Sequence, residues 1–320
     1  MKRWVLLSIL VLTALFVAPT AQAQTCSLGP PSVAFTPFSP ITGAALTATG
    51  TVKVTCTWPL VNLVPNVKIC LGFSASTPRS LSNSGNTIAY DLYTDAGASI
   101  PWGTTPASVL STTFSNSILG YTGSTDINVY AKIAANQTTV PTVQSSDTVY
   151  TTTYAANNVT LSYQFYLLAA PACGTGGFTS GTTSPFTVNV TVTNNCTINA
   201  TGLTFAPSST LANTLTAQGS LGVQCTNNDA YQILLSGGVS GQVGARTLKG
   251  QTLGATIPYQ LYTNSSYATA WGDGTGGTSV YQGTGSGIVV SIPIYGRILP
   301  QPSTPAPDTY KDTITATIQF

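Results

Sequence analysis

Apolar and polar side chains alternate along several short stretches of this chain, and turn-forming residues separate the stretches. The clearest alternations place apolar residues at 52, 54 and 56, at 127–133, at 290–294 and at 314–320. Because side chains two residues apart share one face of a strand, the pattern predicts half-buried strands. The chain contains no glutamate, whereas its 30 Gly and 20 Pro favour turns. We therefore expect an all-β protein made of antiparallel two-layer sandwiches.

The chain also repeats itself. Residues 46–57 align without gaps on 215–226, and residues 88–94 align on 257–263 in the same order. Each copy is about the usual size of one domain. The interpretation is a first domain at 24–172, a Gly/Ser/Thr-rich linker at 173–185 and a second domain at 186–320.

The start of the chain has the form of a secretory signal over residues 1–23. Lys2 and Arg3 precede a short apolar run, and Ala21-Gln22-Ala23 offers a cleavage site. Without the two basic residues, the remaining Lys and Arg balance the eight acidic residues. A neutral chain has no basic face to attract nucleic acid, so that class of partner is not expected.

Six cysteines in an exported protein favour three disulfides. The repeat places Cys26 and Cys56 where the second copy has Cys196 and Cys225, which suggests the pairs 26–56 and 196–225. Cys70 and Cys173 remain and would form the third pair. A zinc site is the alternative, although the CxxC spacing and the histidines typical of such sites are missing.

The residues offer little chemistry. The chain has no histidine, which excludes His-dependent triads, and its aspartates are scattered. Asp91/Asp95 and Asp308/Asp312 are the acidic pairs that lie close in sequence, and the glycines between 272 and 287 lack the strand and helix of a phosphate loop. We expect no enzyme activity, no cofactor and no metal.

The order of these motifs resembles the spore coat protein U-like domain family. The resemblance rests on the early Cys, the Phe-x-Pro turns at Phe35 and Phe205, the strand ending in Cys56 or Cys225, and the segment 308–320. That family resembles the pilins of archaic, Csu-type chaperone–usher pili. The resemblance implies immunoglobulin-like, pilin-like sandwiches, each lacking its final strand and completed by a segment from a neighbouring subunit.

The resemblance gives several segments a role. The second copy stops at Phe320 and would accept a strand, whereas Gln24-Thr25 before Cys26 leaves no arm to donate, which would place the chain at a pilus end. The expected acceptor residues are Ile314, Ala316, Ile318 and Phe320. Segment 186–192 either completes the first copy in the same chain or is the first strand of the second. The implied partners are a periplasmic chaperone, an outer-membrane usher and the donor strand of the adjacent subunit.

One apolar loop distinguishes the first copy from the second. Segment 58–65 is apolar where the second copy has the polar turn 227–229. Exposed apolar loops often mark contact surfaces; alternatively, this one folds inward as extra core. The expected binding residues are Trp58, Leu60, Val61, Leu63, Val64, Ile100, Val140 and Val143.

The resulting hypothesis is a two-domain tip adhesin. It would be exported through the periplasm to the cell surface, would bind hydrophobic abiotic or host surfaces, and would support biofilm formation. The alternatives are a structural pilus or secreted coat subunit without a binding site, or a carbohydrate-binding module.

Overall fold

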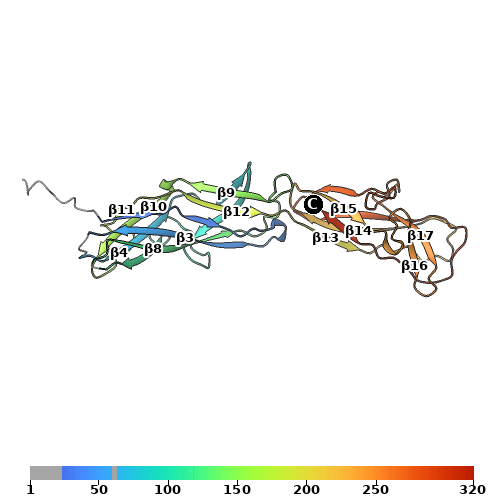
Figure 1. The fold of residues 1–320 in the computed structure, drawn as a ribbon, viewed down its shortest axis with the longest axis horizontal. Coiled ribbons are helices and arrows are strands. Elements are labelled where there is room, and N and C mark those ends of the chain that lie inside the picture. The colour runs from blue at the N-terminus through green and yellow to red at the C-terminus, as the bar shows by residue number, and fades with distance from the viewer. Residues whose placement is uncertain (1–23, 60–62, 118) are drawn as a thin grey trace, which may run out of the picture.

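The computed structural model describes residues 24–59, 63–117 and 119–320. The expected signal at 1–23 lies outside the described residues. The chain forms two β-sandwiches that follow one another along its long axis (Figure 1). The helical segments among the described residues are single 3₁₀ turns, η1 (Pro40–Thr42), η2 (Ala156–Asn158) and η3 (Gly238–Ser240), and none could cross a membrane. The expected all-β tandem of immunoglobulin-like sandwiches is confirmed.

The first sandwich consists of a large and a small sheet. In the described residues the large sheet has the strand order β1-β3-β2-β12-β9-β5-β6-β8, and β8 also pairs with β3. Its strands are β1 (Thr25–Leu28), β2 (Ser32–Ala34), β3 (Leu46–Thr57), β5 (Arg79–Asn83), β6 (Asn86–Tyr93), β8 (Thr122–Ile133), β9 (Thr148–Tyr154) and β12 (Phe186–Val192). The small sheet, in the order β11-β10-β4-β7, contains β4 (Asn66–Phe73), β7 (Leu110–Ser115), β10 (Val159–Tyr166) and β11 (Thr179–Ser180).

The second sandwich repeats this plan with fewer strands among the described residues. One sheet has the order β13-β14-β19-β17-β16-β20 and the other β18-β15-β21. The strands are β13 (Cys196–Thr201), β14 (Leu215–Cys225), β15 (Ala230–Leu235), β16 (Arg246–Gly250), β17 (Thr256–Tyr262), β18 (Tyr281–Thr284), β19 (Val290–Ile298), β20 (Tyr310–Lys311) and β21 (Ala316–Gln319). Within the described part of the chain it has no counterpart of β11 or β12, in line with the expected missing strand.

The boundary between the two cores differs from the expected one. The 173–185 linker contains β11, which pairs with β10, and β12 pairs with both β9 and β2 of the first sandwich. The four apolar side chains of β12 are fully buried in the first core. The first sandwich therefore extends to Val192, and residues 193–195 connect it to β13. Linker-like composition did not mark the boundary, because the tertiary pairing of β12 decides which core this strand joins.

The three disulfides join the expected cysteines. Cys26–Cys56 and Cys196–Cys225 each link the first strand of a sandwich to the long strand beside it, where the bonded residues are direct cross-strand partners. Cys70–Cys173 links β4 to the loop that precedes β11. Because Cys70 lies in β4 of the small sheet, this bond holds the connection to β11 and β12 against the domain they complete.

A buried tryptophan and a buried arginine occupy equivalent places in both sandwiches. The indole N–H of Trp102 donates to the Leu71 carbonyl oxygen at 2.8 Å, and that of Trp271 donates to the Ile233 oxygen at 3.0 Å. Arg246 donates to the Trp271 carbonyl, as Arg79 does to that of Trp102. Because the two indoles donate to β4 and to β15, these strands occupy equivalent positions in the two sandwiches.

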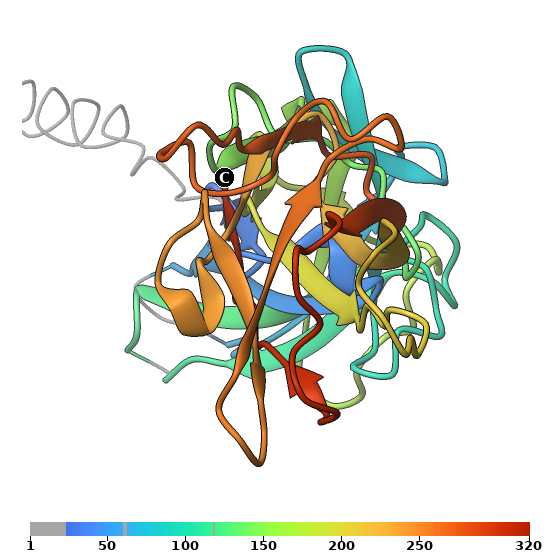
Figure 2. The same cartoon turned by 90° about the vertical axis from the view of Figure 1, so that its right-hand side faces the viewer.

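The sandwiches meet end to end through polar contacts, and Figure 2 views them along the long axis, with the second in front. The Asn227 amide donates to the Thr139 carbonyl at 2.9 Å, and the Ala230 N–H donates to the Ser145 hydroxyl at 3.0 Å. At the centre of this junction Asp229 is fully buried and accepts a hydrogen bond from Thr142 through Oδ1. Its Oδ2 is buried without a partner among the described residues.

The buried carboxyl should make the junction sensitive to pH. Burial raises the pKa of Asp229, and the hydrogen bond from Thr142 opposes this only in part. The stability that this group contributes is present below the pKa it has when unfolded, and is lost as pH rises through the raised folded value. Asp229→Asn should raise Tm at pH 7 by about 2–4 °C, which corresponds to roughly 1 kcal/mol.

The measurement is the difference in Tm between pH 4 and pH 7 for the wild type and the variant. In Asp229→Asn, the part of the Tm decrease from pH 4 to pH 7 that arises from this carboxyl should be absent. Asp126→Asn, an exposed aspartate on β8, is the matched control. Equal pH dependence in the wild type and Asp229→Asn would contradict the assignment.

Candidate functional site: an open groove and an apolar tip

In the first sandwich β12 fills the space between β2 and β9. It runs antiparallel to β9 and parallel to β2. The Phe35 N–H donates to the Asn189 carbonyl at 2.9 Å, and the Phe38 N–H donates to that of Thr191 at 3.0 Å. The alternating side chains of β12 enter the core, where Phe186 contacts the rings of Phe73 and Trp102. This strand therefore closes the first sandwich with a segment from the same chain.

At the corresponding place the second sandwich has an open groove of about 1100 Å³. Its two walls are segments 200–209 and 304–313, the counterparts of the β2 and β9 regions. Apolar side chains from β14, β15, β16, β17 and β19 form the floor: Leu221, Leu235, Leu248, Ile257, Leu261 and Ile294. The groove is therefore an unfilled strand position above an apolar core.

The repeat shows what the groove lacks. Val33, Phe35 and Leu81 of the first sandwich are buried against β12. Their counterparts Leu203, Phe205 and Leu248 are partly exposed in the second. Covering such apolar surface yields about 25 cal/mol per Å², so a strand with alternating apolar side chains fits this site.

The acidic residues near the groove hold its wall in place. Two backbone N–H groups, of Leu253 and Thr252, donate to Asp308 and lower the pKa of its carboxyl. Asp312 accepts from the Tyr259 hydroxyl at 2.7 Å and from the Val239 N–H. Burial and this bond raise the pKa of Tyr259. Both carboxylates thus serve as structural acceptors that anchor segment 308–312.

The expected acceptor residues of the last strand divide into two groups. Ile314 and Ala316 line the groove. Ile318 packs partly buried against the second core, and Phe320 follows the end of β21 and is 51% exposed. Of the four, the structure thus brings two into the groove, whereas Phe320 lines a separate hollow beside Gln232 and Gln319.

A second candidate site lies at the end of the first sandwich remote from the junction. Three loops meet there through their described residues, 58–59 with 63–65, 116–117 with 119–121, and 167–172. None of the segments 58–65, 116–121 and 167–172 contains a charged residue. The Trp58 N–H donates to the Tyr121 carbonyl, the Asn116 N–H to that of Pro65, and the Asn66 amide to that of Leu167. This apolar tip exposes Leu63 (77%), Leu119 (80%) and Leu168 (92%).

The structure changes which residues could form the tip. Trp58 is fully buried between the rings of Phe114 and Phe165, and its indole N–H donates to the Val64 carbonyl. For Trp58 the inward-facing alternative therefore holds: it is not an exposed binding residue but the anchor beneath the loop. Leu60 and Val61 lie outside the described residues.

Three other expected contact residues lie elsewhere. Val140 is buried and Val143 is partly exposed, and both belong to the segment that meets the second sandwich. Ile100 is partly exposed in the loop after β6, where its N–H donates to Asp95. Leu119, Leu167 and Leu168 were missed by sequence reasoning. The unbroken apolar run after β10, which does not continue the alternation, was the available signal.

The described residues contain no cluster of acidic residues, histidine or cysteine that could hold a metal ion. Asp91 pairs with buried Arg79, and Asp95 accepts from the backbone of Ser99 and Ile100. Trp58, Trp102 and Trp271 are all buried, so none offers a face on which a sugar ring could stack.

Comparison with known proteins gives a family and a fold. The model of the Spore Coat Protein U domain matches residues 12–152 and 182–317. No curated protein matches. Among solved structures, the CsuC–CsuE chaperone–tip adhesion subunit complex of archaic chaperone–usher Csu pili from Acinetobacter baumannii aligns with TM-score 0.53 and 17% identity. That alignment covers 92% of this chain and 100% of the other.

Two further structures align less well. The CupB6 tip adhesin from Pseudomonas aeruginosa has TM-score 0.36 and 12% identity, with 92% of this chain and 93% of the other covered. The CFA/I adhesin CfaE of enterotoxigenic E. coli has TM-score 0.31 and 12% identity, with 91% and 92% covered.

Proposed function

Because this chain belongs to the Spore Coat Protein U domain family, we propose that it is an adhesin subunit at the tip of a chaperone–usher pilus. One observation carries this proposal: the strand position that β12 fills in the first sandwich is an open groove in the second. The first sandwich is completed within the chain and is free to contact a surface. The second would join the chain to a fibre by accepting a strand.

The partners follow from the groove. An apolar groove of this size is a liability in solution, so a periplasmic chaperone would cover it before assembly and an outer-membrane usher would exchange that chaperone for the neighbouring subunit. The resemblance of the fold to the CsuE tip subunit, which was crystallised with the chaperone CsuC, supports this assignment. The chain would then act at the cell surface after passing through the periplasm.

The apolar tip would make the contact with hydrophobic surfaces and so support biofilm formation. Its exposed leucines come from three loops that hydrogen bonds hold together, which supports a single contact patch. Aliphatic side chains without nearby charge favour apolar surfaces over hydrated ones. Leu63, one of the residues expected from the sequence, is 77% exposed and is the one we propose as a contact residue in this patch.

The triple variant Leu63→Ser, Leu119→Ser and Leu168→Ser should reduce attachment to an alkyl-coated surface by about tenfold or more. Each leucine contributes about 1.5–3 kcal/mol when fully buried, and 1.4 kcal/mol is tenfold in affinity. Attachment of cells carrying wild-type or variant pili to alkyl-coated and hydrophilic glass measures the effect.

The control replaces three apolar side chains of the second sandwich that are each more than half exposed, Val239, Leu253 and Leu299, with Ser. This control should attach as the wild type does. Pilus yield on the cell must be equal in all strains. Undiminished attachment by the tip variant would leave the structural or coat subunit as the better function.

A further inference from the structure

The segment that completes the first sandwich does more than fill one strand position. Before β12, residues 179–184 cross from the small sheet to the large one. Thr179 and Ser180 pair with β10, the Gly181 N–H donates to the Leu161 carbonyl at 2.8 Å, and Thr182 exchanges backbone hydrogen bonds with the Cys26–Leu28 strand. The segment thus closes the seam between the sheets before it enters the core as β12.

The crossing point admits only glycine. A Cβ atom on Gly181 would lie 2.5 Å from a Leu161 methyl carbon and 2.6 Å from the Cys26 carbonyl oxygen. Carbon atoms pack at about 3.5–4.0 Å, so any larger residue would push the segment off both edges. Phe186, the first large side chain to enter the core, follows five residues later. Val188, Val190 and Val192 then follow at every second position.

Residues 179–182 cover the edges of β10 and β1 in the first sandwich, and in the described second sandwich the two equivalent edges are open. β21 corresponds to β10, because Ile318 pairs with Ile233 as Leu161 pairs with Leu71, and these partners accept the equivalent indole hydrogen bonds. Among the described residues no strand pairs with the outer edge of β21, or with β13 on the side away from β14. An incoming chain therefore finds the seam open as well as the groove.

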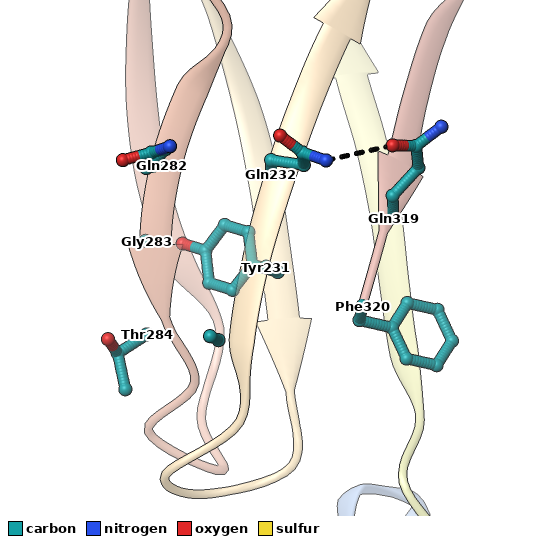
Figure 3. Close-up of a pocket in the computed structure, with 8 residues that line it drawn as sticks. Tyr231, Gln232, Gln282, Gly283, Thr284, Gln319 and Phe320 are labelled. Atoms are coloured by element: carbon teal, nitrogen blue, oxygen red, sulfur yellow. Dashed lines mark hydrogen bonds between the residues drawn. The ribbon is translucent and has the colours of Figure 1, made fainter. Parts of the chain in front are cut away.

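The outer face beside this seam is hollowed. Gln282, Gln232 and Gln319 lie in register across β18, β15 and β21, and Figure 3 shows Phe320 at the end of the outermost strand. These residues line a shallow hollow of about 670 Å³. Gln232 occupies the place of Cys70, whose disulfide to Cys173 holds the loop before β11 over the first sandwich. No described segment covers the equivalent place in the second sandwich, and the hollow lies there.

We propose that the partner's arm binds the second sandwich in two parts, a glycine-containing crossing segment followed by a groove strand. The crossing segment would pair with β21 and β13, and its glycine would pass between Ile318 and the Cys196 carbonyl. Large apolar residues would follow this glycine at the fifth, seventh, ninth and eleventh positions and enter the groove. This inference rests on the proposed strand-accepting function of the same groove.

The chain itself indicates which kind of partner carries such an arm. Segment 182–192 matches the family model as part of the second domain, yet it folds into the domain before it. It ends four residues before Cys196, the first cysteine of its own sequence repeat. The occupant is therefore the N-terminal arm of another domain of this family, with its glycine about 15 residues before that domain's first cysteine, as Gly181 precedes Cys196.

Synthetic peptides with the chain's own sequence test the proposal on the full-length protein. The first peptide spans residues 179–192, the second spans 186–192, and the third is 179–192 with Gly181→Leu. A fourth carries Thr182→Leu, which adds similar bulk at an exposed position and serves as the control. Hydrogen exchange of segments 203–205, 308–313 and 316–319 locates each peptide, and titration gives its affinity.

The full peptide and the control should protect the groove walls and β21, and should bind about tenfold more tightly than the short peptide. The Gly181→Leu peptide should lose the protection of β21 and bind no better than the short one. Equal affinity of long and short peptides, with β21 unprotected by either, would overturn the two-part arm while leaving the strand-accepting groove intact. Failure of every peptide to protect the groove walls would overturn both.

Discussion

Phe186→Ala will destabilise the first sandwich by about 3–5 kcal/mol and leave the second unchanged. The ring is fully buried and packs against the rings of Phe73, Trp102 and Tyr154, so its removal leaves a cavity in the first core. By sequence this residue stands at the start of the second repeat. A loss confined to the first sandwich would show that β12 serves the domain before it.

Tryptophan fluorescence during denaturant unfolding can separate the two domains. Trp58 and Trp102 report on the first sandwich, and Trp271 reports on the second. Measurements in Trp271→Phe and in Trp58→Phe/Trp102→Phe backgrounds follow one sandwich at a time. Thr187→Ala, at the next position of the same strand, removes a side chain that points out of the core and should change stability by about 0.5 kcal/mol or less. A shift of the Trp271 transition by Phe186→Ala would contradict the placement of β12.

Arg246→Ala will destabilise the second sandwich by about 3–5 kcal/mol. The side chain is fully buried and donates to the carbonyls of Ser236 at 2.9 Å, Trp271 at 2.9 Å and Leu235 at 3.2 Å, and to the Gln260 amide oxygen. Burial lowers the pKa of its guanidinium, which nevertheless stays protonated at any ordinary pH. Its removal leaves several buried oxygens without donors and opens a cavity beside the groove floor.

A lysine variant separates the branched hydrogen bonding of the Arg246 guanidinium, the fork, from its charge, and a variant of a second arginine serves as a control. Arg246→Lys keeps the charge but cannot reach carbonyls on two sides at once, so it should recover only part of the loss. Arg297→Ala removes a partly exposed arginine that stacks on Tyr262 and Tyr267, and should cost about 1 kcal/mol. The measurement is again denaturant unfolding followed by Trp271. Full stability of Arg246→Lys would show that the charge, and not the fork, is what the site requires.

The repeat carried most of what could be predicted. Alternation at 52–56 and 127–133 identified buried strand faces, because a strand exposes every second side chain to one side. Alignment of the copies also paired the cysteines, since Cys26–Cys56 and Cys196–Cys225 are cross-strand partners at equivalent positions. These features depend on local periodicity and on a comparison within the chain, and neither needs the tertiary structure.

The tip was predicted only in part. An apolar loop can face either way, and the sequence of 58–65 does not contain the pocket that receives Trp58. That pocket is made by Phe114 and Phe165, which lie far away in the chain. Leu168 is exposed for the complementary reason: nothing in the described structure packs over the loop after β10. Burial of a loop side chain depends on distant partners, and local sequence does not specify them.

By itself, the sequence determined the all-β class, the two copies, the disulfide pairs and the apolar character of the tip loops. The tertiary structure decided the site on which the proposed function rests. Segment 186–192 has the same alternation whichever sandwich it joins, and its membership is settled by long-range pairing with β9 and β2. Only after that pairing is known does the open groove of the second sandwich become visible, because a missing strand is recognised by the space it leaves in a packed core.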